Sequence, residues 1–256
     1  LLPNGRRIFN VAIRTIQLHQ GQAIYGVGGG ITWDSTWESE YREVHQKAAV
    51  LYRKQARFQL ITTGKISQKQ LLFEDQHLER LTKASRYFAF PFDPKKLRQK
   101  IEEECQVCDD NQDYRLRIIT SKSGEMELSR QILSPLSPSF CKAKLCLQEA
   151  DLQQAFTYFK TTHRPHLSLG KQESIYHNAA GELLETSIGN LVLKIAGKLY
   201  TPPIRLGILP GIYRQHLLER GLVEEKVLTL KDLAQAEAIY GCNAVRGLYE
   251  LEVNSK

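Results

Sequence analysis

Two polar segments of this sequence carry side chains that could do chemistry together. Lys160 lies in the run 158–164, and Glu185 follows in the run 181–190, just before the turn at Gly189. A lysine amine can form a Schiff base with an aldehyde, and a carboxylate on a strand can keep a ring nitrogen protonated. The order of these two residues therefore predicts a site for an aldehyde compound with a basic ring nitrogen.

Other residues could bind a phosphate group. Arg80 lies in a helical pattern, a glycine-rich turn at 207–211 leads into another helix, and the pair Asn243–Ala244 follows near the end of the chain. Arginine and the free amides at a helix start are good phosphate ligands. A Schiff-base amine, a carboxylate and phosphate donors are together what pyridoxal phosphate needs, so the sequence predicts this cofactor.

Each of these residues also has an ordinary structural explanation. A single lysine is most often a solvated side chain, and Glu185 suits the polar face of a hairpin. Arg80 could be one half of a surface ion pair, which contributes little stability. Only the joint order of the residues favours a cofactor site.

Composition narrows the class of protein. The 256 residues are 42% hydrophobic and 25% charged, which is typical of one large or two modest globular domains. The formal charge of +7 comes from scattered basic residues, which fits a pocket for an anionic small molecule better than nucleic-acid binding. Five cysteines without zinc spacing, no signal peptide and no apolar run of membrane length predict a reduced, cytoplasmic protein without a membrane partner.

The elements that position these residues follow from periodicity and turn signals. Strands are expected at 9–16 and 22–34, and helices after the caps Ser35, Asp75 and Asp93. Hairpins are expected across 123–124, 179–181 and 196–197, and a last helix over 231–240. Strands and helices mix without strict alternation, which predicts a mixed α/β (α+β) fold. We expect domains at 1–56, 57–138 and 139–256, the last carrying Lys160.

The order of the segments resembles the fold-type IV (class IV) pyridoxal phosphate enzymes, which include branched-chain and D-amino acid aminotransferases and aminodeoxychorismate lyase. The matching stretches are 77–81, 160–164, 181–191, 201–203, 207–214 and 243–247. The resemblance implies a small α/β domain, a larger mixed-sheet domain, a homodimer, and Lys160 as the catalytic Schiff-base lysine. It implies Glu185 as the partner of the pyridine nitrogen. The implied phosphate ligands are Arg80, the backbone of Ile208 and Leu209, and Asn243 with Ala244.

The first 56 residues resemble the C-terminal end of a chorismate-binding aminodeoxychorismate synthase domain. This resemblance implies that Arg14 and the amides of Gly28, Gly29 and Gly30 belong to a chorismate site, with Glu40 and Glu43 as magnesium ligands. A solvated helix face and a strand break explain the same residues. We expect a strand-strand-helix remnant without synthase activity, because these residues are only a small part of such a domain and its pocket would be incomplete. Magnesium would serve only the intact synthase domain.

Together the two resemblances predict a fragment of a para-aminobenzoate synthase fusion that cleaves aminodeoxychorismate to 4-aminobenzoate and pyruvate, for folate synthesis. In the intact pathway a glutamine amidotransferase subunit would be a partner. The alternatives are a class IV amino acid aminotransferase and an inactive docking or dimerisation remnant. Two departures from the family pattern bear on substrate choice: Thr62 stands where a Glu-Thr pair is usual, and His166 where a tyrosine is common.

Overall fold

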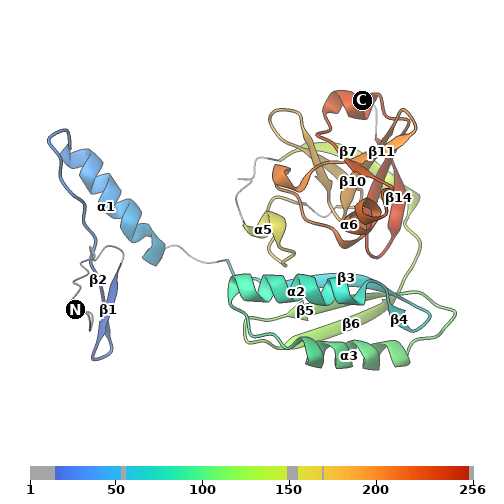
Figure 1. Ribbon diagram of the computed structural model, residues 1–256, viewed down its shortest axis with the longest axis horizontal. Helices are drawn as coiled ribbons and strands as arrows, with labels where there is room; N and C mark the ends of the chain where they lie inside the picture. Colours follow the sequence, from blue (N-terminus) through green and yellow to red (C-terminus); the bar gives the residue numbers. More distant parts are fainter. Residues whose placement is uncertain (1–14, 53–55, 149–154, 169, 254–256) are drawn as a thin grey trace, which may run out of the picture. The chain divides into compact units, whose positions relative to one another are not determined.

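Contacts divide the chain into two units, Leu1–Ala56 and Arg57–Lys256. The computed structural model describes residues 15–52, 56–148, 155–168 and 170–253 (Figure 1). The mixture of sheets and helices confirms the mixed α/β class. In the described part of the chain, no helix combines the length and apolar character needed to cross a bilayer.

The first unit is a strand-strand-helix segment. Strands β1 (Ile16–His19) and β2 (Gln22–Tyr25) pair antiparallel. The turn residues between them, Gln20 and Gly21, both have positive φ, which suits the twist of a two-residue hairpin. Strand β2 is shorter than the predicted 22–34, and the predicted strand at 9–16 lies almost entirely outside the described residues. Helix α1 (Trp37–Tyr52) begins just after the predicted cap and buries none of its residues.

A four-stranded antiparallel sheet begins the second unit, with the order β4-β3-β5-β6. Its strands are β3 (Leu60–Ser67), β4 (Gln70–Leu71), β5 (Tyr114–Thr120) and β6 (Met126–Ile132). Successive strand residues point to opposite faces. Leu116 and Ile118 of β5 are therefore buried in the core, whereas Arg115 and Arg117 lie on the other face. The hairpin from β5 to β6 forms at the predicted position.

Two helices pack on this sheet, α2 (Glu74–Phe88) along β3 and α3 (Pro94–Gln106) along β6. Helix α3 begins as predicted, because the Asp93 carboxylate accepts hydrogen bonds from the amides of Lys95 and Lys96. The predicted cap of α2 is wrong. This helix starts before Asp75, after Phe73 in a left-handed conformation, without a side-chain cap.

The larger part of this unit is built on an eight-stranded sheet, in the order β12-β11-β10-β13-β14-β7-β8-β9. The strands are β7 (Lys142–Leu147), β8 (Ser174–His177), β9 (Leu183–Thr186), β10 (Asn190–Ile195), β11 (Lys198–Thr201), β12 (Glu224–Glu225), β13 (Ala238–Asn243) and β14 (Gly247–Val253). Edge strand β9 also pairs with β10 at Glu185 and Asn190. The sheet therefore curls back on itself, and Glu185 at its β9 edge lies opposite Asn190 of β10.

Short helices connect these strands: α4 (Pro138–Cys141), α5 (Ala155–Tyr158), the 3₁₀ turn η1 (Ile204–Leu206), α6 (Ile212–Glu219) and α7 (Leu230–Ala234). The predicted last helix over 231–240 is wrong in its second half. Residues from Ala238 onward instead form β13, because that strand pairs with both β10 and β14.

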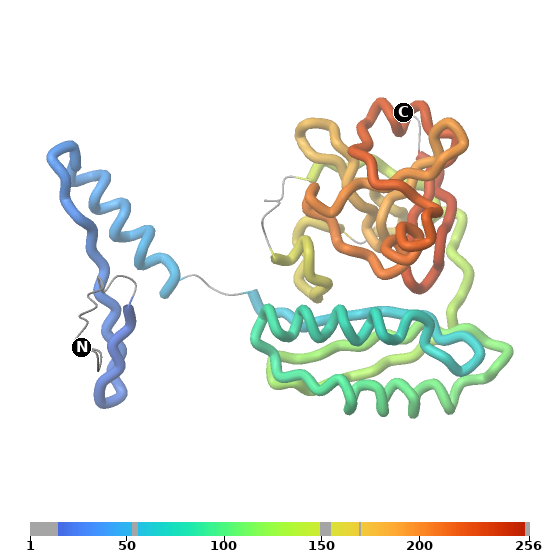
Figure 2. The backbone as a smooth tube through the Cα atoms, viewed as in Figure 1, coloured from blue at the N-terminus to red at the C-terminus, as the bar shows by residue number. Residues whose placement is uncertain are grey.

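The segment after α5 joins the two sheets (Figure 2). The amide of Ile61 donates to the Lys160 carbonyl at 3.1 Å, and the amide of Thr162 donates to the Gln59 carbonyl at 2.9 Å. These bonds form a short antiparallel bridge between Thr161 and Leu60 of β3. The backbone of Lys160 is therefore fixed against the four-stranded sheet, although its sequence neighbours belong to the larger part.

Candidate active site

Lys160 lines a cavity of about 700 Å³ in the second unit. Among the described residues, its Nζ has no hydrogen-bond or ion-pair partner. Burial, followed by the positive charges of Arg80 and Arg164, lowers the pKa of Lys160 to about 7. A large fraction of this amine is therefore neutral at physiological pH, which is the form that attacks a carbonyl.

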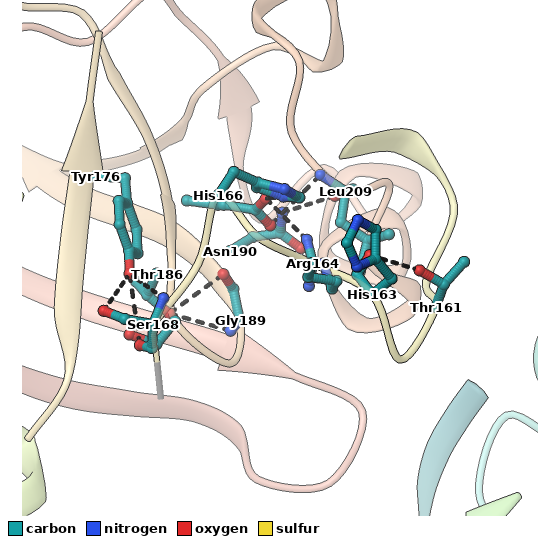
Figure 3. A network of polar contacts seen from close by, with 12 residues as sticks. Thr161, His163, Arg164, His166, Ser168, Tyr176, Thr186, Gly189, Asn190 and Leu209 are labelled. Atoms are coloured by element: carbon teal, nitrogen blue, oxygen red, sulfur yellow. Dashed lines mark hydrogen bonds and ion pairs between the residues drawn. The ribbon is translucent and has the colours of Figure 1, made fainter. Parts of the chain in front are cut away.

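Glu185 lines the same cavity from β9 and is only 2% exposed. Figure 3 shows Arg164, His166 and Leu209 converging, and the Glu185 carboxylate lies among them. Its Oε1 accepts a hydrogen bond from the Arg164 guanidinium at 3.0 Å, and its Oε2 accepts one from the Leu209 amide at 3.4 Å. Burial raises the pKa of Glu185, whereas Arg164 lowers it.

Arg80 reaches the cavity from α2 and donates to the Pro210 carbonyl at 2.8 Å. This contact places the guanidinium at the turn that precedes α6. Gly211 is the N-cap of α6, and its carbonyl accepts a hydrogen bond from the amide of Gln215. The helix amides before Gln215 are thus available to an anion beside Arg80.

The structure brings together most of the predicted cofactor residues, with two qualifications. Leu209, Asn243 and Ala244 line the cavity with Lys160. Ile208 does not line it; its side chain, which the prediction did not concern, is buried in a separate apolar cluster. The Asn243 side chain accepts hydrogen bonds from the Val245 and Arg246 amides, at 2.9 Å each, and so shapes the turn between β13 and β14.

The charge of the cavity is strongly one-sided. Among its described lining residues, Glu185 is the only acid, facing Lys160 and five arginines: Arg80, Arg115, Arg117, Arg164 and Arg246. Arg115 and Arg117 come from the outer face of β5, and Arg246 comes from the turn after β13. Such a cavity suits a ligand that carries several negative charges.

The residues present fit pyridoxal phosphate. A partly neutral lysine amine, a buried carboxylate, and an arginine beside free helix amides line one cavity of ordinary ligand-binding size. The Nε of Arg164, which lines the cavity, is buried without a hydrogen-bond partner in the described part of the chain, which also marks a polar ligand site.

The residues predicted for a chorismate and magnesium site are less complete. Arg14 lies outside the described residues. The carbonyl of Gly28 accepts from Lys47 Nζ at 2.9 Å, and this lysine also pairs with Glu43 at 2.5 Å. Glu40 accepts from the Ser35 hydroxyl at 2.6 Å, close to Gly29. Gly30 has open space around it. No group of three or more potential metal-ligating side chains occurs among the described residues.

Sequence reasoning missed several residues of this cavity. Ile212 lines it next to the predicted turn at 207–211, and the Pro-Gly dipeptide before a helical pattern was the available signal. The alternation Arg115-Leu116-Arg117 on a strand indicated two arginines on one face. Nothing local to Arg246 indicated that it would meet them.

Two family models match different parts of the chain. Residues 59–251 match the family model of amino-transferase class IV, and residues 1–53 match that of chorismate binding enzyme. The aminodeoxychorismate lyase of Saccharomyces cerevisiae is 24% identical over 204 residues, covering 59% of this chain and 54% of the relative. The chain therefore spans about half the length of that curated relative.

Solved structures share the fold of the second unit. A provisionally assigned amino-acid aminotransferase from Mesorhizobium loti has a TM-score of 0.68 and 27% identity, covering 77% of this chain and 100% of that one. A hypothetical aminotransferase from Mycobacterium tuberculosis, in its PLP-bound form, has a TM-score of 0.64 and 18% identity, with 77% of this chain and 81% of that one covered.

Proposed function

Because this chain belongs to the amino-transferase class IV family of pyridoxal phosphate-dependent enzymes, we propose that its second unit is a 4-amino-4-deoxychorismate lyase. The observation that carries the proposal is the cavity that Lys160, Glu185 and Arg80 line together with three further arginines, Arg115, Arg117 and Arg246. Among the described residues, none of these three forms an ion pair with Glu185. A substrate with two carboxylates would use those extra positive charges.

We expect the residues of the cavity to have separate roles in binding the cofactor and moving a proton. Arg80 and the first amides of α6 would hold the phosphate, and Glu185 would accept the ring N–H. Bound pyridoxal phosphate supplies a protonated ring that withdraws electrons from the carbon bearing the substrate amine. Lys160 would remove the proton from that carbon and return a proton later, a role that its lowered pKa of about 7 favours.

Two further observations favour a lyase within a fusion protein. The segment matching the chorismate-binding family directly precedes the class IV domain, so one chain would carry both parts of a two-step conversion of chorismate. The yeast relative is named as an aminodeoxychorismate lyase. In the intact parent we expect a homodimer and a glutamine amidotransferase partner. The five free cysteines fit a reducing, cytoplasmic location.

Amino acid transamination is the second candidate, because the relative from Mesorhizobium loti is provisionally assigned that activity and aligns over its full length. The two reactions use the same lysine and carboxylate. They differ in products: the lyase forms 4-aminobenzoate and pyruvate without an amino acceptor, whereas a transaminase needs a 2-oxo acid acceptor.

The first experiment is reconstitution with pyridoxal phosphate. We expect the folded protein to gain the visible absorption band of lysine-bound cofactor and the Lys160→Ala variant to lack it. Lys83→Ala is the matched control, since Lys83 is an exposed lysine paired with Glu79 on α2, and it should keep the band. Reconstituted protein is then supplied with aminodeoxychorismate, and its products are identified. A folded wild type without the band would instead support an inactive docking remnant.

A further inference from the structure

Arg164 and Glu185 form a buried ion pair within the cavity. The guanidinium nitrogen lies 3.0 Å from Glu185 Oε1, and the two side chains are only 16% and 2% exposed. Arg164 comes from the loop after α5 (Figure 3), Glu185 comes from β9, and both side chains line the cavity. A carboxylate this deeply buried depends on its partners to stay charged.

The other groups that face Glu185 cannot replace this charge. The Nε2 of His166 lies 4.0 Å from Oε1, but burial and then Arg164 lower the pKa of His166 to about 4, so the ring is neutral at pH 7. The Leu209 amide makes a longer bond of 3.4 Å to Oε2. The charge of Lys160 acts more weakly on Glu185 than Arg164 does, and its amine is consumed when it binds an aldehyde.

A ring nitrogen placed against Glu185 would share one proton with it. In a dry site, the neutral arrangement, with the proton on the carboxyl group, competes with the charged arrangement, with the proton on the ring. Arg164 is bonded directly to the carboxylate and is farther from any ring that binds on its free side. It therefore stabilises the charged carboxylate more than it repels a charged ring.

The two carboxylate oxygens also have different surroundings. Oε1 accepts the hydrogen bond from Arg164, whereas in the described part of the chain Oε2 accepts only the long bond from the Leu209 amide. A ring N–H entering the cavity would therefore find its acceptor at Oε2.

We propose that Arg164 is a positioning residue, which holds Oε1 of Glu185 and so keeps the shared proton on the ring nitrogen of the cofactor. The inference rests on the proposed function, because it requires pyridoxal phosphate in this cavity. It involves the transfer of one proton between two atoms, with no bond to carbon made or broken.

The test is nitrogen NMR of the full chain loaded with pyridoxal phosphate carrying ¹⁵N in its ring. The wild type is expected to give the signal of a protonated ring nitrogen at neutral pH. In Arg164→Gln the signal should shift toward that of an unprotonated ring, and Arg164→Lys should restore most of the wild-type position. A purely structural role for Arg164 would weaken cofactor binding without this shift.

Two control variants test whether the shift depends on the charge beside Glu185, or follows the loss of any neighbouring side chain or of any arginine. His166→Phe removes an uncharged neighbour of the Glu185 carboxylate, and this variant should leave the signal in place. Arg98→Gln removes an exposed arginine of α3 that pairs with Glu74 and Asp75, and it should do the same.

The outcomes distinguish this inference from the proposed function. Failure of the wild type to take up pyridoxal phosphate would overturn the proposed function. Uptake with an unprotonated ring in the wild type would overturn the role of Arg164 even if the Gln variant does not fold. A protonated ring in a folded Arg164→Gln variant would overturn it as well.

Discussion

The chemistry of this cavity depends on how single side chains are charged. Lys160 and Glu185 are both buried, and burial disfavours the charged form of each: it lowers the pKa of the lysine and raises that of the glutamate. Arg164 acts in the same direction on both residues, because its positive charge further lowers the pKa of Lys160 and opposes the effect of burial on the pKa of Glu185. Arg164 therefore favours a neutral amine beside a charged carboxylate.

This balance predicts the pH dependence of Lys160 in the cofactor-free protein. The neutral fraction of the amine rises as the pH passes through the pKa of about 7, so reductive methylation of Lys160 should reach half its maximal rate near that pH. The measurement is peptide mass spectrometry after brief treatment with formaldehyde and a mild hydride donor. Protein unfolded in denaturant should show the ordinary lysine midpoint, roughly 10.4.

Arg80→Gln extends the same experiment. After burial, Arg80 is the largest cause of the lowered pKa of Lys160, so its removal should move the midpoint to higher pH. A midpoint in the wild type equal to that of the unfolded protein would contradict this account of Lys160.

At the scale of elements, the turn before α6 is the most constrained backbone of the site. Asn190 donates from its side chain to the Leu209 carbonyl at 2.8 Å, which ties this turn to β10. Gly211 lies so close to the Asn190 side chain that an added Cβ would collide with its oxygen. This close approach is what requires glycine at position 211. Its backbone conformation does not, because a φ of −69° is accessible to any residue.

We therefore expect Gly211→Ala to lower the free energy of unfolding by roughly 1–3 kcal/mol and to weaken pyridoxal phosphate binding. The matched variant is Asp93→Ala, which removes the cap of α3 outside the cavity and should cost about 1 kcal/mol with unchanged cofactor affinity. Denaturant titration and cofactor titration measure the two quantities. Wild-type cofactor affinity in a destabilised Gly211→Ala protein would show that this turn does not contact the cofactor.

At the scale of the second unit, the cavity belongs to neither sheet alone. Arg115 and Arg117 come from the four-stranded sheet, and Arg246 comes from the turn between two strands of the larger one. Burial and the charge of Arg115 lower the pKa of Arg246, so the two positive charges act on each other. Among the described residues, neither has a carboxylate partner, and a bound anion would remove their repulsion.

The expected result for Arg246→Gln is therefore a raised KM for a substrate with two carboxylates, by roughly tenfold or more, at unchanged cofactor affinity. Steady-state kinetics and cofactor titration measure the two effects, with Arg98→Gln as the surface control. Equal weakening of substrate and cofactor would indicate that Arg246 binds the phosphate instead.

The sequence alone determined the local features and the chemical types. Arg80, Lys160 and Glu185 could be selected because an arginine, a lysine and a carboxylate in that order along the chain suit one cofactor, and they line one cavity. The Asp93 cap and the hairpin after Thr120 also formed as predicted, since caps and tight turns depend on a few neighbouring residues.

Only the tertiary structure decided which distant residues meet. Strand pairing with β10 and β14 converted the end of a predicted helix into β13, and the curl of the large sheet placed Glu185 beside Arg164. The gathering of five arginines around one glutamate has no local signature, because they come from helix α2, strand β5, the loop after α5 and the turn between β13 and β14. Contacts between segments far apart in the chain are set by packing, which a local pattern does not encode.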